Sequence, residues 1–408
     1  MVNVFAPVYI CTFVDMFFDL YRNQAHSPTY NAVKMLFIYF MHEYESVSDM
    51  IRKNAWTQSE SYFLFQISRM DGNRIMKRMR ASILRRYKGS LNPSNLCLAI
   101  DDTDNPCYSK TLPGIQTWKS SKGSFHGQKV MVCALVDRTR KFALPLFFEF
   151  CTPKSSKTYK SGIERAFDLG MKAVNMGFTG LPLVADSWFD SEELAQKFRD
   201  EGVVFVWELK GSRNAKNTAD KKGQWRKLKE MFGNLSRSSV GKKDKKKLIS
   251  TRLLSLKSHK TKIKAVACYN TETDKKAFAY YASTDLTLSG ARIWSLFRTR
   301  WYIECLFYDL KNHLNLGKIS TKHERVNELA FVIPFVILVY MRLNPGAFGL
   351  VSGQTVSTMI EKLKFRHEKE TLKGLASGAY KKKLEIIINR RKSINKKPTN
   401  KGPEVLAS

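Results

Sequence analysis

The chain has 408 residues, which is enough for two or three domains and a sizeable core. Its 43% hydrophobic and 12% aromatic residues exclude a largely disordered chain. The 69 Lys and Arg against 36 Asp and Glu give a formal charge of +33, which favours a nucleic acid as the partner. A membrane surface is the weaker alternative, because no basic amphipathic helix with a clean apolar face stands out.

Cysteine usage and apolar runs indicate the compartment. The seven cysteines form no Cys-x-x-Cys pair, so neither a zinc site nor a disulfide framework is expected. Asp15 and Asp19 interrupt the apolar N-terminal stretch, so no signal peptide is expected. The longest apolar run, residues 329–341, contains Pro334 and is interpreted as a buried helix. We therefore expect a cytoplasmic protein without membrane contact.

Residues 1–90 are predicted to form a helical DNA-binding domain. Apolar residues such as Val33, Leu36, Phe37 and Phe40 recur at helical spacing. A basic stretch follows at the end of this region, and its members are Arg74, Lys77, Arg78, Arg80, Arg85, Arg86 and Lys88. The alternative interpretation is a solvated basic face on a helical domain.

From Leu96 the hydrophobic pattern changes to that of strands and helices in alternation. Short apolar runs ending in acids predict buried strands, and Asp137 to Lys141 predicts a hairpin turn. The predicted order is strand 96–101, strand 130–137, strand 142–150, helix 159–176, strand 181–186, helix 191–200 and strand 203–209. This is the order of a ribonuclease-H-like core, so the expected fold class is α/β with a mixed sheet flanked by helices.

The remaining chain completes the expected domain organisation. The first part of the core covers residues 91–210, and a β-rich basic insertion covers 211–285, with strands at 248–256, 262–269 and 277–283. The core resumes at residues 286–345, and this part contains a predicted helix at 297–311. Residues 346–408 are expected to form a C-terminal helical region and a basic tail from about Arg390.

Residues 297–311 are predicted to form one helix with a distinctive face. At about 100° per residue, Phe297, Arg300, Glu304 and Lys311 fall within an arc of roughly 60°. One acid flanked by two bases is typical of a metal-dependent enzyme that acts on a phosphate polymer. It is also typical of an ordinary helix with an Arg300–Glu304 ion pair.

Two further carboxylates are expected at strand ends. Asp101 and Asp102 end the first predicted strand, and Asp186 ends the fourth. Chemistry in open α/β sheets gathers at such carboxyl ends, and converging carboxylates hold Mg²⁺. Taken singly, each acid is more often a turn former or a member of an ion pair than a catalytic residue. Alternation along a strand puts Asp101 and Asp102 on opposite faces, so only one can point into such a site.

In these motifs the chain resembles DDE transposases of bacterial insertion sequences, of the insertion-sequence-four type. The signature Tyr-(2)-Arg-(3)-Glu-(6)-Lys of that group is matched in spacing by Phe297, Arg300, Glu304 and Lys311, with Phe in place of Tyr. The Ile-Asp-Asp-Thr and Ala-Asp-Ser-Trp-Phe segments are similar to its first and second acid motifs. The resemblance covers roughly residues 95–345.

The resemblance implies an active site. Asp102, Asp186 and Glu304 would hold the metal, Mg²⁺ or Mn²⁺, with two ions in each active site. Asp102 is favoured over Asp101 because the acid directly before Thr matches the family pattern. Arg300 and Lys311 would grip transposon-end DNA, with Phe297 at the tyrosine position.

Three other residues are candidate DNA contacts. His126 begins the second predicted strand and can approach a DNA end, or it is an ordinary surface histidine. Trp188 and Trp301 can stack on unpaired bases, or they belong to the core.

The resemblance implies a cut-and-paste transposase. Metal-dependent hydrolysis at the transposon ends would be followed by transfer of the 3′-hydroxyl into target DNA. The partners would be double-stranded DNA, as inverted-repeat ends and as target, and a second copy of the chain in a homodimeric synaptic complex. The location would be the bacterial cytoplasm, in association with the nucleoid. The alternatives are a ribonuclease-H-like structure-selective nuclease or resolvase, and a non-catalytic DNA-binding protein derived from a transposase.

Overall fold

The computed structural model describes residues 28–376 except for short gaps at 43, 45, 54–58, 108–111, 113, 121–122, 220–222, 233–234, 242–246, 258–261, 320–322 and 349–353. The chain divides into two compact units. The helical unit comprises residues up to Asp71, His313–Asn315 and residues from Asn344, and the sheet unit comprises Gly72–Asn312 and Leu316–Leu343. The expected basic tail from Arg390 and most of the lysine run at 242–247 lie outside the described residues.

The helical unit contains only helices among its described residues. They are α2 (Pro28–Met41), α3 (Val47–Lys53), α4 (Glu60–Ser68), the 3₁₀ turn η5 (Pro345–Phe348) and α11 (Val356–Ala376). The hydroxyl of Ser59 caps α4 by accepting from the backbone N–H of Tyr62. The side-chain amide of Asn315 donates to the carbonyls of Tyr39 and His42, which ties the end of α2 to this segment.

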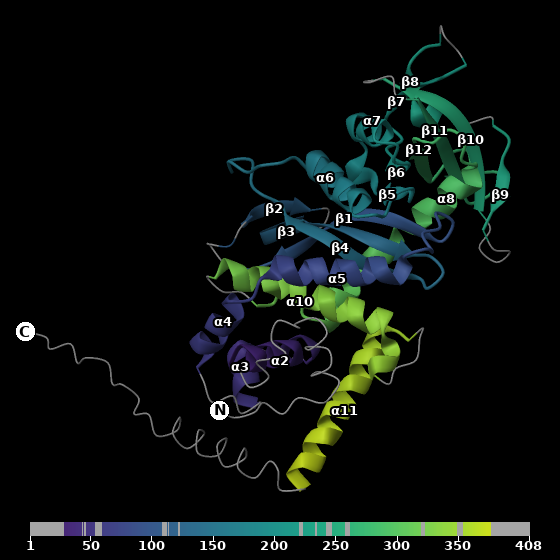
Figure 1. The fold of residues 1–408 in the computed structure, drawn as a ribbon. Helices are drawn as coiled ribbons and strands as arrows, with labels where there is room; N and C mark the ends of the chain where they lie inside the picture. Colours follow the sequence, from purple (N-terminus) through teal and green to yellow (C-terminus); the bar gives the residue numbers. More distant parts are fainter. Residues whose placement is uncertain are drawn as a thin grey trace, which may run out of the picture. The chain divides into compact units, whose positions relative to one another are not determined.

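The sheet unit is built on a sheet of 12 strands (Figure 1). Along one path they are hydrogen-bonded in the order β2-β3-β1-β5-β6-β12-β11-β10-β7-β8, with β4 on β3 and β9 on β10. The strands are β1 (Leu96–Pro106), β2 (Gln116–Ser120), β3 (Gly123–Asp137), β4 (Phe142–Phe150), β5 (Leu183–Ala185), β6 (Phe205–Leu209), β7 (Asn214–Asn217), β8 (Arg226–Lys227), β9 (Ser238–Val240), β10 (Lys247–Leu256), β11 (Lys262–Tyr269) and β12 (Ala279–Ser283).

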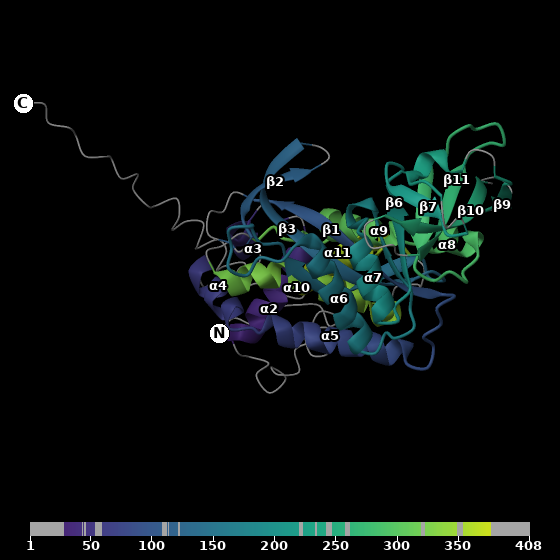
Figure 2. The ribbon, with the colours of Figure 1, turned by 90° about the horizontal axis from the view of Figure 1, so that it is seen from above.

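The first half of this sheet has the predicted element order. β1, β3 and β4 are antiparallel, β5 pairs parallel with β1, and β6 pairs parallel with β5. The connecting helices are α6 (Gly162–Asn175) and α7 (Glu192–Asp200), and a capping box of Ser161 and Glu164 begins α6. The mixed α/β class predicted from the sequence is therefore confirmed. β2 was not predicted; it pairs with the first residues of β3, and the two extend as a ribbon (Figure 2).

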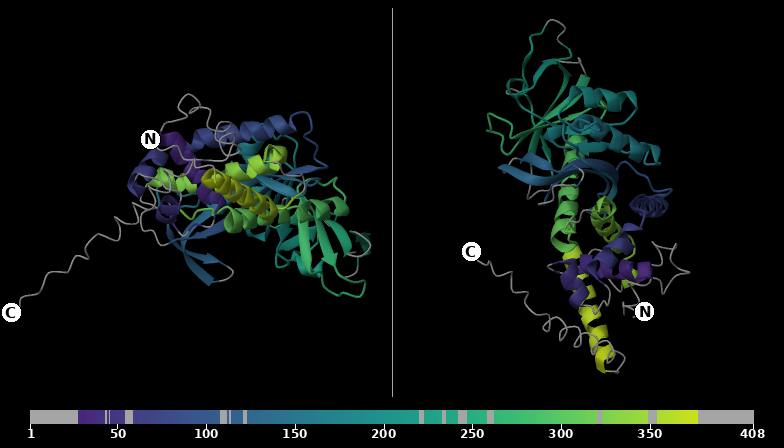
Figure 3. Two further views of the ribbon diagram at one scale, coloured as in Figure 1. Left: turned by 90° about the horizontal axis from the view of Figure 1, so that it is seen from below. Right: turned by 90° about the vertical axis from the view of Figure 1, so that its left-hand side faces the viewer.

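Helices cover both faces of these strands. α6 and α7 lie on one face, and α5 (Gly72–Tyr87) and α10 (Glu324–Leu343) lie on the other (Figures 1 and 3). The apolar side of α5 is buried, and the hydroxyl of Tyr87 donates to Asp137 Oδ2 at 2.9 Å. The basic α5 thus belongs to the sheet unit, so the units divide at Asp71 and Gly72, whereas the sequence interpretation placed a boundary near residue 90.

α10 is a long and strongly apolar helix. By length and composition it could cross a membrane, but 83% of its most apolar window is buried inside the protein. Phe331 and Phe335 pack on Phe148 of β4 with ring centroids 6.0 and 5.4 Å apart. The buried helix predicted at 329–341 is confirmed, and it forms the core beneath the sheet.

The β-rich insertion continues the same sheet. The predicted strands at 248–256, 262–269 and 277–283 correspond to β10, β11 and β12. β12 pairs antiparallel with both β6 and β11, so it joins the insertion to the first half of the sheet. The chain then enters α8 (Gly290–Arg298) and α9 (Trp301–His313).

Candidate active site

The strand registers align four polar side chains in one row. Ala99 pairs with Val184 between β1 and β5, and Ala185 pairs with Trp207 between β5 and β6. Glu208 in turn pairs with Tyr281 of β12. Continuing these registers puts Asp101, Asp186, Glu208 and Tyr281 at one level, and residues at one level of a sheet point to the same face. The row lies at the carboxyl ends of β5 and β6, as the sequence predicted for Asp186. β1 continues to Pro106, so Asp101 and Asp102 lie within their strand and do not end it as predicted.

The helix predicted across residues 297–311 is broken, which corrects the sequence interpretation. α8 ends at Arg298 and α9 begins at Trp301, with Thr299 and Arg300 between them. The backbone N–H groups of Thr299 and Arg300 bond to carbonyls three residues back, which is the tighter 3₁₀ pattern. The hydroxyl of Thr299 donates to the carbonyl of Leu296 and lies 3.1 Å from Cys97 Sγ, which stabilises the turn.

This turn places Arg300 among the carboxylates. Its Nη1 donates to Asp101 Oδ2 at 2.8 Å, and its Nη2 donates to Glu304 Oε1. Burial alone would lower the pKa of Arg300, but Asp101, Glu304 and Asp186 together raise it. Asp101 of β1 and Glu304 of α9 therefore share this cation directly, and Asp186 acts on it through its charge. Arg300 Nε is buried and has no hydrogen-bond acceptor within the described chain.

Asp101 is the most perturbed of these acids. Burial raises its pKa to about 7, with Asp186 and Asp102 adding to the rise and Arg300 opposing it. Its Oδ1 accepts the backbone N–H of Asp102 at 2.8 Å. A carboxylate buried beside other carboxylates needs a cation to ionise, and Arg300 supplies one here.

Asp102 contacts different groups. Lys129 Nζ lies 3.4 Å from both of its carboxylate oxygens and 3.7 Å from Asp104 Oδ1. Burial raises the pKa of Asp102, and Lys129 opposes that rise. In the register of β1 with β3, Lys129 is opposite Asp104, so it lies on the face of even-numbered β1 residues. The structure thus brings Asp101, and not Asp102, together with Arg300 and Glu304.

Lys311 and Asp186 have local partners of their own. Lys311 Nζ donates to the backbone carbonyl of Asp104 at 2.6 Å, which ties α9 to β1. Asp186 Oδ1 accepts the N–H of Trp188 at 2.8 Å and so caps the 3₁₀ turn η2 (Ser187–Phe189). The capping bond fixes the Asp186 carboxylate at the end of β5.

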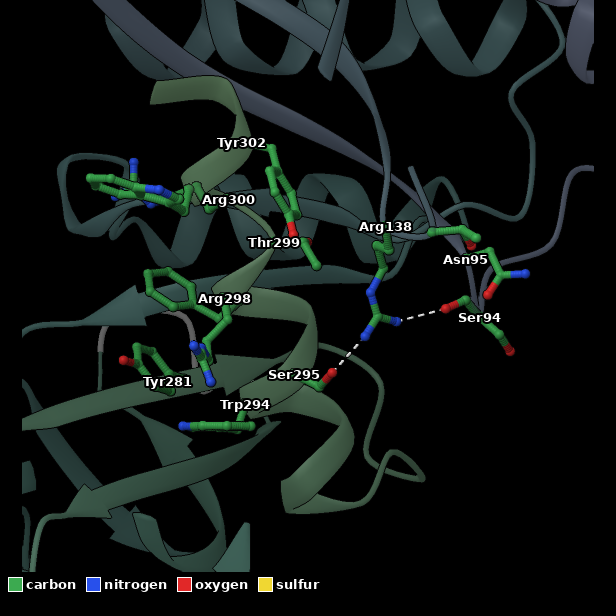
Figure 4. A pocket seen from close by; sticks show the side chains of 13 residues that line it. Ser94, Asn95, Arg138, Tyr281, Trp294, Ser295, Arg298, Thr299, Arg300 and Tyr302 are labelled. Carbon is green, nitrogen blue, oxygen red and sulfur yellow. Dashed lines mark hydrogen bonds between the residues drawn. The ribbon is translucent and has the colours of Figure 1, made fainter. Parts of the chain in front are cut away.

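A pocket of 770 Å³ opens beside the α8–α9 turn (Figure 4). Its lining contains no Asp or Glu, and it comprises Ser94, Asn95, Arg138, Thr139, Tyr281, Trp294, Ser295, Phe297, Arg298, Thr299, Arg300, Trp301 and Tyr302. Arg138 donates to the carbonyl of Ser94 at 2.7 Å and to Ser295 Oγ at 2.5 Å. Arg298 lies over the ring of Trp294 at 4.7 Å. The pocket is therefore basic and aromatic, and Arg300 connects it to the carboxylates.

The four aromatic and histidine residues that were predicted to contact DNA lie in different surroundings. Phe297 is buried and stacks on Tyr281 with centroids 4.2 Å apart. Trp301 lines the pocket and is 61% exposed. Trp188 is 64% exposed, and Lys129 Nζ lies 5.4 Å from its ring. His126 is exposed on the β2–β3 ribbon and does not join the carboxylate row.

Two residues of this site were missed by sequence reasoning. Lys129 and Glu208 lie inside strand patterns, where a polar residue signals only the alternation of faces. Glu208 could have been found from its position after an apolar run, which it shares with Asp101 and Asp186.

The chemical nature of the donor groups at this site suits a hard divalent cation. Asp101, Asp186 and Glu304 supply the carboxylate oxygens that Mg²⁺ prefers, and one cationic group already lies among them. As they stand, no three His, Cys, Asp or Glu side chains in the described residues are close enough to share an ion. Arg300 would therefore have to release Asp101 or Glu304 to admit one.

These features define a mixed α/β protein with a carboxylate site at the ends of parallel strands. Residues 92–340 match the family model described as "Transposase DDE domain". The match spans well over half of the chain, so this protein belongs to that family of DDE transposases.

The chain can also be compared with curated proteins and with solved structures. No curated protein matches the chain. Among solved structures, a cryo-EM structure of a piggyBac transposase synaptic complex with hairpin DNA is similar at 14% sequence identity and a TM-score of 0.46, covering 98% of this chain and 81% of that one.

Proposed function

We propose that this chain is an active transposase that cuts DNA at the ends of its element and joins those ends to target DNA. The observation that carries the proposal is that Arg300 bonds to Asp101 and Glu304, with Asp186 at the same level of the sheet as Asp101, within a DDE domain. In the first reaction, the oxygen of water bonds to the phosphorus and the 3′-oxygen leaves. In the second, that 3′-hydroxyl oxygen bonds to a target phosphorus and displaces a target 3′-oxygen.

Asp101, Asp186 and Glu304 would hold the Mg²⁺ or Mn²⁺, and we place Asp101 where the sequence favoured Asp102. The strand registers and the shared Arg300 support this choice. Divalent cations held by these residues would supply activation of the attacking oxygen and stabilisation of the leaving one. Asp102 would act indirectly, by holding Lys129 at the other face of β1.

Arg300 would hold a DNA phosphate next to the carboxylates. Its buried Nε has no acceptor in the described chain, and its guanidinium fork matches a phosphate. The adjoining pocket carries Arg138 and Arg298 and no carboxylate, so a DNA strand would meet only positive or neutral groups there. Trp301, Trp188 and His126 remain proposed DNA contacts, as does Phe297 through its place in the pocket wall.

Lys311 also remains a proposed DNA contact. In this structure its ammonium group bonds to the Asp104 carbonyl, so a phosphate would have to share or displace that bond. Joining two ends to one target requires two active sites, which supports a homodimer on paired inverted-repeat ends. We place this reaction in the bacterial cytoplasm, at the nucleoid.

The test uses purified protein, Mg²⁺, and DNA carrying the inverted repeats that flank its gene. Release of the element and its joining to a second DNA are expected. Cleavage without joining would favour a structure-selective nuclease or resolvase instead. Binding with neither reaction would favour a non-catalytic DNA-binding protein derived from a transposase. Glu304→Gln and Asp186→Asn should each abolish cleavage and leave end binding in place.

A further inference from the structure

A second pocket lies where β6 leads into the β-rich insertion, and its volume is 450 Å³. It shares no lining residue with the pocket beside the α8–α9 turn. Three cations, one carboxylate and two neutral polar residues line it, namely Lys210, Arg213, Lys257, Glu192, Ser212 and Asn214. A polar lining with an excess of positive charge suits an anion and not an apolar ligand.

Arg213 is held in this pocket by Asp190. Its Nε donates to Asp190 Oδ2 at 3.0 Å, and its Nη2 donates to the Asp190 carbonyl. The Asp190 carboxylate is 1% exposed and also accepts from Trp207 Nε1 at 3.2 Å and from the backbone N–H of Lys210 at 3.1 Å. Arg213 Nη1 has no acceptor within the described chain. The guanidinium is therefore fixed in position with one nitrogen left for a ligand.

Lys210 and Lys257 bring positive charge that no carboxylate of the described chain neutralises. Both side chains are exposed, and neither ammonium group makes an ion pair or a hydrogen bond among the described residues. Lys129, Lys172 and Lys197, in contrast, are each paired with a carboxylate. Two unpaired lysines and a fixed arginine around one cavity are the groups that recognise a phosphate.

The β7–β8 ribbon continues the positive charge beyond the pocket. Asn214 of the pocket pairs with Lys227, and Ala215 pairs with Arg226. Both residues of β8 are exposed. A free phosphate would need only the pocket, whereas a nucleic acid carries phosphates at regular spacing and would contact the pocket and the ribbon together. The arrangement therefore favours a nucleic acid strand over a small anion.

The pocket lies close to the carboxylate row. Asp186 and Asp190 are the two ends of the turn η2, and four residues span at most about 14 Å. Arg213 Nε is 3.0 Å from Asp190. Because each DNA strand carries one phosphate per about 3.4 Å of helix axis, a phosphate in the pocket would lie within about five nucleotides of one at Asp186.

We propose that this second pocket binds a backbone phosphate of duplex DNA, within about five nucleotides of the position that is cut. The inference rests on the proposed function for the identity of the substrate as DNA. Lys210, Arg213 and Lys257 would contact the phosphate and no base, so the contact would be independent of sequence. It would hold the strand in register while the carboxylate site acts on it.

The test compares Lys210→Gln with Lys257→Gln, as a double variant, with wild type. By fluorescence anisotropy between about 50 and 200 mM salt, the slope of log affinity against log salt should fall by about 2. The loss should be the same on end DNA and on an unrelated duplex. Lys172→Gln with Lys197→Gln removes the same charge from paired lysines and is the control. An equal fall in slope for the two double variants would overturn the proposal.

Ethylation interference on end DNA gives the position of the contact. With wild type, ethylation of phosphates within about five nucleotides of the cut should weaken binding. With the pocket double variant, one or two of those positions should no longer matter, because the contact that ethylation blocks is already gone. If every position still matters, the two lysines attract DNA only at long range and the pocket holds no phosphate.

Inorganic phosphate separates a free anion from a DNA phosphate. At millimolar phosphate and constant ionic strength, the Tm of wild type and of the pocket double variant should change alike. A rise in Tm for wild type alone, with equal salt slopes on DNA, would make the pocket a site for a free anion and overturn the proposal.

The proposed function fails by a different result. If wild type neither cuts nor joins DNA, and the pocket double variant still loses the two contacts, the proposed function is wrong and the pocket assignment stands. If wild type cuts and joins, and the double variant keeps the wild-type slope and interference pattern, only the pocket assignment is rejected.

Discussion

At the scale of single residues, Asp101 and Asp102 are neighbours in sequence with different partners. Asp101 shares Arg300 with Glu304, whereas Asp102 lies against Lys129 on the other face of β1. The sequence showed that only one of them could point into a site on a given face of the sheet. The sequence could not show which of the two acids this is, because that depends on how the residues of β1 align with those of β5 and on the position of the α8–α9 turn.

The two acids should therefore differ in mutational effect. Asp101→Asn should lower end cleavage by at least about 100-fold, since a carboxylate shared with the metal would be lost. Asp102→Asn should lower it by about 10-fold or less, because Asp102 acts through Lys129. Single-turnover cleavage of end DNA measures both. The reverse order of effects would restore Asp102 as the first ligand.

The raised pKa of Asp101 predicts a pH dependence of stability. Its pKa is about 7 in the folded protein against an ordinary value of 3.8, so folding favours the protonated acid. That contribution is complete below about pH 4 and is lost as the pH rises through 7. In EDTA, the Tm of wild type should fall relative to that of Asp101→Asn between pH 4 and pH 8. Parallel Tm curves for the two proteins would contradict the assignment.

At the scale of elements, the α8–α9 turn decides the geometry of the site. The spacing of Arg300 and Glu304 predicted their contact, and the contact is present. The break at Thr299 was not predictable from periodicity, because the apolar pattern continues through it and a buried Thr299–Cys97 contact joins residues 202 positions apart. The strands at 142–150 and 262–269 were predicted with their observed bounds, since turn residues flank both.

The hydroxyl of Thr299 should stabilise this turn measurably. Thr299→Val keeps the side-chain shape but leaves the Leu296 carbonyl and the Cys97 thiol without this partner. The free energy of unfolding should fall by about 1 kcal/mol, measured by urea titration. Thr251→Val, at an exposed position on β10, is the control and should stay within about 0.5 kcal/mol of wild type. Equal effects of the two changes would remove the special role of Thr299.

At the scale of the whole molecule, the net charge of +33 attracts polyanions, and DNA is the proposed one. The basic residues of α5 were predicted to belong to an N-terminal module, yet α5 packs in the sheet unit. Its apolar residues dock on that unit and leave Lys77 and Arg86 exposed. Sequence periodicity gave the helix but could not give the unit against which its apolar side packs.

DNA binding should therefore depend on salt through α5. Lys77→Gln with Arg86→Gln should reduce the slope of log affinity against log salt by about 2, because each phosphate contact contributes close to 1. Fluorescence anisotropy between 50 and 200 mM salt measures the slope. The control pair is Lys172→Gln with Lys197→Gln, whose ammonium groups are already paired with Glu149 and Glu193. If the two pairs lower the slope equally, α5 is not the DNA-contacting face.

β12 has a consequence for how the protein is made. β6 leaves the ribosome about 70 residues before β12, the strand that covers its edge, and Arg300 and Glu304 emerge later still. Until then β6 presents an open edge that can pair with other chains, and Asp101 and Asp186 have no Arg300 to share. A chain truncated before residue 279 is expected to aggregate, and it would lack both Arg300 and Glu304. Under the proposed function, this order of synthesis would prevent a nascent chain from cutting DNA before residue 304 has emerged.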